Sequence, residues 1–142
     1  MKSHPDYRAQ GILRAEAFQK KSTLTEDELS ERLRYFNHSH TGPIYHPDMD
    51  LCVIAQDGRF ASGCEALINA NCLEADVERV CTHSDFRKRG LARAVIQECL
   101  YRLKAMGIQN AYITGYSPGA LALYGSLGAV DEVRSFVYEA AT

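Results

Sequence analysis

The clearest pattern of apolar and polar positions lies between residues 91 and 107. Apolar side chains recur there at three- and four-residue spacing and predict one amphipathic helix: Ala92, Val95, Ile96, Cys99, Leu100, Leu103 and Met106. Gly107 is typical of the residue that ends such a helix. Near the start of the chain, the looser spacing of Tyr7, Ile12, Leu13 and Phe18 predicts a helix over about residues 5–20. Thr25 and Glu28 have the spacing of a capping box, so another helix should run from there to about residue 37.

The middle of the chain has the pattern of strands. Three antiparallel strands are predicted over residues 51–55, 59–70 and 73–82, with a hairpin turn at Asp57-Gly58. Gly63 indicates a bulge or a close-packing point. A fourth strand over residues 111–114 follows the long helix and should run parallel to the third.

The last part of the chain adds one helix and one more strand. Ser117 and Pro118 have the residue types of an N-cap and a first helical position, and Gly128 should end that helix. Residues 130–140 supply the last strand or hairpin. The order of elements predicts an α/β fold in which helices flank a mixed central sheet.

Composition narrows the function classes. The 142 residues suffice for one domain, which we expect to span residues 1–142. A formal net charge of -2 argues against nucleic acid or an anionic membrane as a partner. Five cysteines without a Cys-x-x-Cys motif are typical of reduced packing residues, so a cytoplasmic protein is expected. A catalytic thiol is the rival interpretation, and it would apply to Cys81.

Three histidines raise the question of a metal site. His38, His40 and His46 follow the second predicted helix in a predicted loop. No carboxylate or thiolate is spaced to complete a ligand set on a rigid element. We therefore expect surface histidines and no metal, with substrate contact as a lesser alternative.

A basic loop immediately precedes the long helix. Arg87, Lys88 and Arg89 add side-chain charge to a helix N-terminus, whose unpaired N–H groups already carry about half a positive charge. Gly90 allows the backbone to approach a ligand closely. The loop could be only a solvated turn, but its chemistry fits a phosphate or pyrophosphate. It matches neither the Walker nor the Rossmann fingerprint.

Two motifs resemble those of a known family. The loop Arg87-Lys88-Arg89-Gly90-Leu91-Ala92 fits the pattern Arg/Gln-x-x-Gly-x-Gly/Ala and resembles the acetyl-CoA signature of the GNAT superfamily, the GCN5-related N-acetyltransferases. Residues 117–129 are similar to the family pattern Asn-x-x-Ala-x-x-Leu-Tyr-x-x-x-Gly-Phe, with Ser117 in place of Asn and Ala129 in place of Phe. The resemblance covers about residues 50–139. The family fold usually begins with a strand, so here we expect the first strand to be missing, vestigial or supplied by a partner. An uncovered edge would favour a homodimer.

The resemblance implies an acyltransferase that uses acetyl-CoA as co-substrate and acetylates a primary amine of a small molecule or peptide by direct attack. It assigns cofactor binding to one strand end, the loop and the two helices: Val80, Cys81, Thr82, Arg87, Lys88, Arg89, Gly90, Leu91, Ala92, Ser117 and Tyr124. Backbone of residues 80–82 would pair with the pantetheine arm and stabilise the developing oxyanion. By the matching position, Tyr124 is the candidate general acid. Glu78, two residues before Val80, is the candidate base.

Alternatives stay open for these roles. Tyr124 could be a packing aromatic, and Glu78 and Asp76 could be surface carboxylates that face a cationic substrate. The whole domain could also bind acyl-CoA as a sensor or partner module without turnover. The sequence carries no readable code for the acceptor.

Overall fold

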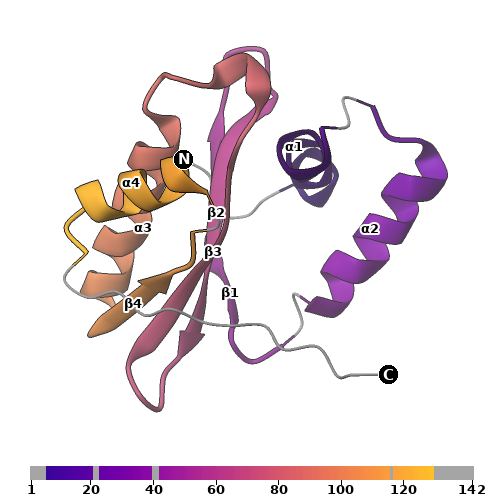
Figure 1. The fold of residues 1–142 in the computed structure, drawn as a ribbon. Coiled ribbons are helices and arrows are strands. Elements are labelled where there is room, and N and C mark those ends of the chain that lie inside the picture. Colours follow the sequence, from indigo (N-terminus) through magenta and orange to yellow (C-terminus); the bar gives the residue numbers. More distant parts are fainter. Residues whose placement is uncertain (1–5, 21–22, 40–41, 116, 130–142) are drawn as a thin grey trace, which may run out of the picture.

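The computed structural model describes residues 6–20, 23–39, 42–115 and 117–129. Helices and strands follow in the order α1 (Tyr7–Gln19), α2 (Glu26–Ser39), β1 (Tyr45–Ile54), β2 (Phe60–Asn69), β3 (Glu74–Thr82), α3 (Leu91–Ala105), β4 (Asn110–Ile113) and α4 (Pro118–Ser126), with a short 3-10 turn at Ser84–Phe86. Figure 1 shows three layers, with α1 and α2 on one face of the sheet and α3 and α4 on the other. The strand expected over residues 130–140 lies outside the described residues.

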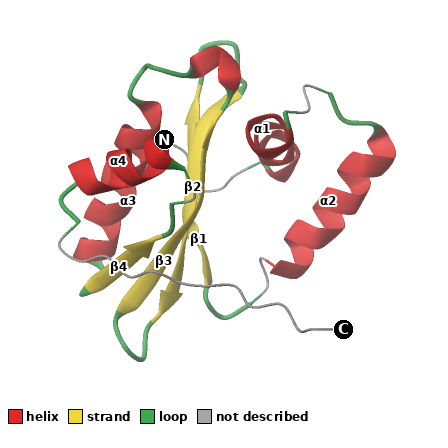
Figure 2. Ribbon diagram, viewed as in Figure 1, coloured by secondary structure: helices red, strands yellow, loops and turns green. Residues whose placement is uncertain are grey.

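The sheet is mixed, as predicted. Its strand order is β1-β2-β3-β4, and the strands can be followed side by side in Figure 2. The pairs β1–β2 and β2–β3 are antiparallel, whereas β3 and β4 are parallel and connected through α3. Among the described residues the first element is α1, and no strand pairs with the outer edge of β1.

The turn and cap signals of the sequence are confirmed. The backbone N–H of Thr25 donates to Glu28 Oε2 at 2.9 Å, and the N–H of Glu28 donates to Thr25 Oγ1 at 3.2 Å, which completes the capping box. Gly58 adopts φ +89° in the β1–β2 turn, a backbone region that favours glycine. Ser117 caps α4 by accepting a hydrogen bond from the N–H of Ala120 at 3.1 Å.

The core lies between the sheet and α3. Val95, Ile96, Cys99 and Leu103 are all at most 2% exposed, so the predicted apolar stripe of α3 faces the sheet. Full burial of an aliphatic side chain of this kind contributes about 1.5–3 kcal/mol. Met106, at the end of the stripe, is largely exposed. Within the described ranges, no helix combines the length and the apolar character needed to cross a bilayer.

Helix α1 is buried only partly through the residues that the sequence indicates. Leu13 is buried as expected, but Ile12 and Phe18 are exposed, whereas the polar side chains of Gln10, Arg14 and Glu16 are buried. The apolar pattern therefore marks only part of the buried face of this helix. The reason is that polar groups of the sheet and of the loop after β3 lie beneath α1 and bond to these side chains.

Two sequence expectations for residues 38–50 were wrong. Strand β1 begins at Tyr45 rather than at residue 51, so His46 lies in a strand, and α2 extends over His38, so neither lies in a loop. His40 lies outside the described residues. The register of β1 shifts between Tyr45 and Asp50, which breaks the alternation that a sequence pattern depends on. No group of three or more His, Cys, Asp or Glu residues in the described part of the chain is placed to hold a metal ion.

Candidate active site

Strands β3 and β4 pair over only part of their length. Their parallel register ends at the pair Val77–Ile113, while β3 continues to Thr82 and the chain after Ile113 leaves toward α4. Within the described residues, the edge of β3 from residue 78 to residue 82 therefore has no strand partner on the β4 side. Backbone groups on such an edge can bind an extended ligand.

A bulge in β3 sits at the start of this open edge. Between paired positions, β2 advances from Gly63 to Glu65 while β3 runs from Cys81 back to Glu78, so β3 holds one extra residue. Arg79 adopts φ +51° at this point. The bulge changes which side chains face which layer: Val77 packs in the core under α3, whereas Cys81 packs against Leu13 of α1.

Gly63 is a close-packing point, and the bulge lies in the neighbouring strand. A Cβ at position 63 would lie 3.0 Å from the carbonyl oxygen of Leu51 in β1. Because that oxygen belongs to the backbone of the adjacent strand, it cannot move aside cheaply. Close packing, one of the two alternatives for Gly63, is thus confirmed. The bulge in β3 could not be predicted from the sequence, because an arginine within a strand pattern does not indicate one.

The basic loop forms one wall of a pocket of about 210 Å³ at the N-terminus of α3. Six sequence-predicted residues line it: Thr82, Arg87, Lys88, Gly90, Leu91 and Ala92. Lys88 and Gly90 have φ of +60° and +72°, and Gly90 is the N-cap residue of α3. Backbone with left-handed residues at a helix start is typical of anion-binding loops.

Three further residues line this pocket that the sequence did not single out: Phe86, Arg93 and Leu123. Arg93 lies in the first turn of α3, and its Nη2 donates to Ser126 Oγ of α4 at 2.6 Å. Helical spacing from Gly90 could have indicated Arg93, because it follows the N-cap by three residues. Leu123 is the leucine of the second family pattern, but the sequence indicated no binding role for it; α4 brings it to the pocket.

Arg89 is placed differently from Arg87 and Lys88. It is not among the described residues that line the pocket, and its guanidinium carbon lies 5.5 Å from the centroid of the Phe86 ring. Arg59 approaches the same ring at 4.8 Å and bonds through Nη1 to Asp85 at 2.8 Å. The hairpin turn after β1 therefore braces the loop through Arg59, with Phe86 held between two cations.

Helix α1 also braces the loop, through Glu16. Its Oε2 accepts a hydrogen bond from the N–H of Ser84 at 2.9 Å. Burial by itself would raise the pKa of Glu16, but the hydrogen bonds from Ser84 and the charges of His83 and Arg87 hold it below its ordinary value. Glu16 is therefore ionised at neutral pH and ties α1 to the start of the loop.

The candidate acid and base come from α4 and β3. Tyr124 is partly buried against the core. Its pKa is raised mainly by this burial and, to a smaller extent, by the charges of neighbouring groups that include Glu78. Burial, and then the charge of Asp76, raises the pKa of Glu78, although Arg79 acts in the opposite direction. Glu78 pairs with Glu65 across the sheet and so projects on the α1/α2 face. The two candidate groups are close enough to affect each other electrostatically.

The other predicted residues on β3 and α4 have structural partners. Val80 packs against the core under α3, and the hydroxyl of Ser117 is engaged in capping α4. Cys81 is 7% exposed, and burial raises its pKa to about 12. Its thiol is therefore protonated at neutral pH, which argues against the rival interpretation of a catalytic thiol.

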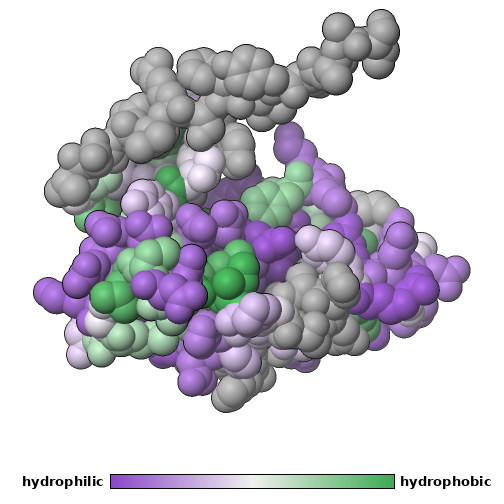
Figure 3. All heavy atoms as spheres, turned by 90° about the horizontal axis from the view of Figure 1, so that it is seen from below, coloured by the Kyte–Doolittle hydropathy of each residue, from purple (hydrophilic) through white to green (hydrophobic). Residues whose placement is uncertain are grey.

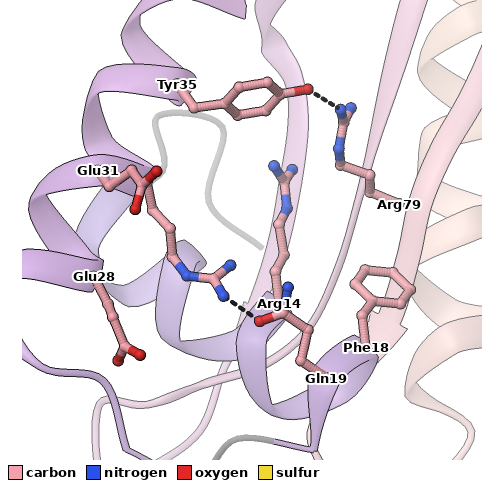
Figure 4. Close-up of a pocket in the computed structure, with 8 residues that line it drawn as sticks. Arg14, Phe18, Gln19, Glu28, Glu31, Tyr35 and Arg79 are labelled. Carbon is pink, nitrogen blue, oxygen red and sulfur yellow. Dashed lines mark hydrogen bonds between the residues drawn. The ribbon is translucent and has the colours of Figure 1, made fainter.

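A second, larger pocket lies between α1, α2 and β3. Its volume is about 600 Å³, and it is lined by Arg14, Phe18, Gln19, Glu28, Glu31, Arg32, Tyr35 and Arg79. Figure 4 shows that α1 and α2 contribute most of these side chains, with the hydroxyl of Tyr35 turned toward Arg79. The two pockets are lined from opposite faces of the sheet, because α1 and α2 line the larger one and α3 and α4 line the loop pocket.

Several solved structures with the same fold are acetyltransferases by name. A putative acetyltransferase from Agrobacterium tumefaciens superposes with a TM-score of 0.70 at 21% identity, covering 95% of this chain and 94% of the other. Glucosamine-6-phosphate N-acetyltransferase from Arabidopsis thaliana gives 0.67 at 16% identity, with 96% and 95% covered. AAC(6')-Iy in complex with the bisubstrate analogue CoA-S-monomethyl-acetylneamine gives 0.66 at 15% identity, with 96% and 92% covered. No curated protein matches the sequence.

The sequence itself carries the family assignment. The model of the Acetyltransferase (GNAT) family matches residues 13–129, from α1 to the end of α4. This range includes the split strands, the basic loop and both candidate catalytic residues. The chain belongs to the GNAT family of acetyltransferases.

Proposed function

We propose that this protein transfers the acetyl group of acetyl-CoA to a primary amine of a small molecule or peptide, by direct attack of the amine on the thioester. The observation that carries the proposal is the open edge of β3, which runs from Glu78 to Thr82, where Thr82 already lines the loop pocket. One extended ligand could thus have its anionic end at α3 and its reactive end beside Glu78. We further propose that residues 1–142 act as one catalytic domain.

The chemistry of the loop pocket fits the diphosphate of coenzyme A. Arg87, Lys88 and Arg93 supply cationic groups, and the first N–H groups of α3 lie beside Gly90, which has no Cβ. A Cβ built at Gly90 would meet no atom within 4 Å, which supports open space for a ligand there. Backbone of Val80, Cys81 and Thr82 would bind the pantetheine arm. When bound, acetyl-CoA supplies the activated acetyl group.

Glu78 would remove the proton that stops an amine from reacting. A free alkylamine has a pKa of ~10 and is almost entirely protonated at neutral pH. The pKa of Glu78 is raised toward neutral pH, which makes the carboxylate a stronger base. It would accept the proton of the amine directly or through water. A backbone N–H of the open β3 edge would donate to the carbonyl oxygen on which negative charge develops.

Tyr124 would return a proton to the departing sulfur. Its raised pKa keeps the phenol protonated at neutral pH, which a proton donor requires. Gly115 permits this position, because a Cβ there would lie 3.3 Å from the Tyr124 ring and 3.0 Å from Leu121. Tyr124 thus lies against the chain segment that leaves β4 and opens the split.

The acceptor class remains broad at this level. Among the similar structures, one enzyme is named for glucosamine-6-phosphate and another is bound to an acetylneamine analogue, and these are different kinds of amine. For this chain we propose that the acceptor is an amine of a small molecule or a peptide, and that neither nucleic acid nor a membrane is a partner. A cytoplasmic location and a homodimer stay predictions from the sequence.

The test is release of free thiol from acetyl-CoA across a panel of amines, peptides and amino sugars. Binding is measured separately, as the rise in melting temperature with CoA, which follows from mass action. The proposal predicts that CoA raises the melting temperature and that thiol release depends on the amine. A rise without release from any amine would favour the sensor alternative, and no rise at saturating CoA would reject the coenzyme site.

A further inference from the structure

The larger pocket collects arginine side chains from three separate elements. Arg14 comes from α1, Arg32 from α2 and Arg79 from the bulge in β3. Figure 4 shows Arg14 rising between the two helices toward Arg79. These residues are distant in sequence, so only the fold brings their guanidinium groups to one pocket. Guanidinium groups offer planar sets of N–H donors that match carboxylate and phosphate oxygens.

Two of the three arginines share one buried carboxylate. Arg14 Nη2 lies 3.6 Å from Glu65 Oε2, and Arg79 Nη1 bonds to Glu65 Oε1. Glu65 is 1% exposed and Arg14 is 7% exposed, so these two groups are shielded from water, whereas the side chain of Arg79 is 32% exposed toward the pocket. One carboxylate between two guanidinium groups leaves an excess positive charge at the pocket wall. Shielding strengthens its attraction for an anion.

The third arginine has a neutral partner, and one of the two pocket glutamates is engaged elsewhere. Arg32 donates through Nη2 to the amide oxygen of Gln19. The carboxylate of Glu28 is bound to the N–H of Thr25 at the N-terminus of α2, and Glu31 is exposed to solvent. The formal charges of the cluster and lining residues balance, and one carboxylate, that of Glu65, pairs with both Arg14 and Arg79.

Negative charge lies at the other end of this region, on β3. Glu78 directly precedes Arg79, and Asp76 is an exposed carboxylate on the same strand face. The α1/α2 side therefore presents carboxylates along β3 and, beside them, the arginines of the pocket. A ligand with an amine at one end and an anionic group at the other complements both.

We propose that the arginine pocket binds an anionic oxygen group, carboxylate or phosphate, of the acceptor while its amine lies toward Glu78. This inference rests on the proposed function, because it treats the α1/α2 side as the acceptor side. The preferred substrates are then primary amines that also carry a carboxylate or a phosphate. Phe18 and Tyr35, two exposed aromatic residues of the pocket, contact the body of such an acceptor.

Matched acceptors test the preference. Ethanolamine is compared with O-phosphoethanolamine, and β-alaninamide with β-alanine, so that each pair differs in the anionic group and the two pairs separate phosphate from carboxylate. The measurement is kcat/KM for thiol release from acetyl-CoA. We expect the anionic member of at least one pair to be favoured roughly tenfold or more, the scale of one charge-assisted hydrogen bond. Equal values, or a preference for the neutral member in both pairs, would overturn the inference.

Arg32→Gln is the main variant, because Arg32 lies outside the buried ion cluster. Removing Arg14 or Arg79 would leave Glu65 short of a counter-charge and destabilise the fold, so Arg79→Lys serves as the second variant. Both substitutions should lower kcat/KM for the favoured anionic acceptor, by about tenfold for Arg32→Gln, and change it less than about threefold for the neutral one. Arg8→Gln is the matched control, because Arg8 is exposed and pairs with Glu26 outside the pocket. An equal loss for both acceptors in Arg32→Gln would count against an anion site.

A binding measurement separates this inference from the proposed chemistry. Protein saturated with CoA, whose diphosphate fills the loop pocket, is titrated with O-phosphoethanolamine and with β-alanine. A rise in melting temperature that Arg32→Gln removes and Arg8→Gln retains supports the anion site even if no thiol is released. No rise with either anionic amine overturns it, while thiol release from neutral amines would leave the proposed function intact.

Discussion

The two pockets beside β3 are built in opposite ways. The loop pocket takes most of its lining from one continuous stretch, residues 82–93, and the groups that would meet a ligand are backbone N–H groups and nearby exposed cations. The larger pocket takes its lining from α1, α2 and β3, and two of its arginines, Arg14 and Arg79, pair with Glu65, which is distant from both in the chain. A contiguous site can be recognised from a motif, whereas a dispersed one depends on how the helices pack.

Both pockets are lined by arginines. On the face shown in Figure 3, the described residues present small apolar patches among hydrophilic ones. The comparison therefore predicts that electrostatic substitutions will distinguish the two pockets more sharply than apolar ones.

Tyr124→Phe should give the largest effect and leave both pockets intact. The ring keeps its packing, but the hydroxyl proton is lost, so kcat should fall by roughly 10²–10⁴-fold, the usual contribution of a general acid. CoA binding, followed by the rise in melting temperature, should be unchanged. Full turnover in the variant would remove Tyr124 from the mechanism.

Glu78→Gln tests the carboxylate that lies between the pockets. In the wild type, kcat/KM should rise with pH through the raised pKa of Glu78, because the base works only when deprotonated. In the variant, activity should be lower by about a hundredfold near neutrality, and the acidic limb of the pH profile should disappear. A profile with the same acidic limb in both proteins would assign that limb to another group.

Arg87→Ala and Arg89→Ala should differ, although the sequence gives the two residues equal weight. Arg87 lines the loop pocket, so its loss should weaken CoA binding by roughly ten- to a hundredfold at low salt, and by less at high salt. Arg89 lies over Phe86, so its loss should weaken binding by only a few-fold. Equal losses would mean that both side chains meet the phosphates.

Thr25→Ala should give the smallest effect, and it acts on the acceptor side alone. The substitution removes the hydroxyl that caps α2, which should cost about 1 kcal/mol of unfolding free energy in urea titrations. CoA affinity should not change, because none of the described α2 side chains lines the loop pocket. A matched change in CoA affinity would show that the two sides are coupled through the sheet.

Several elements followed from the sequence because their signals are local. The stripe of α3, the capping box of α2 and the Asp57-Gly58 turn each depend on residues a few positions apart, and each is present. The start of β1 and the buried face of α1 did not follow, because a register shift and contacts with distant polar groups decide them. Even within a motif, the sequence does not predict where every side chain lies. The guanidinium of Arg89 lies over the ring of Phe86, and the motif gives no indication of this contact.

By itself the sequence determined the family, the order of elements along most of the chain and the loop that would hold the diphosphate, since these depend on neighbouring residues and on backbone preferences. Only the tertiary structure decided that an extra residue at Arg79 turns Cys81 toward α1, and that arginines from three elements converge beside Glu78. The physical reason is that burial and charge pairing depend on distances in space. Residues 14, 32, 65 and 79 become neighbours only when α1 and α2 close over the sheet.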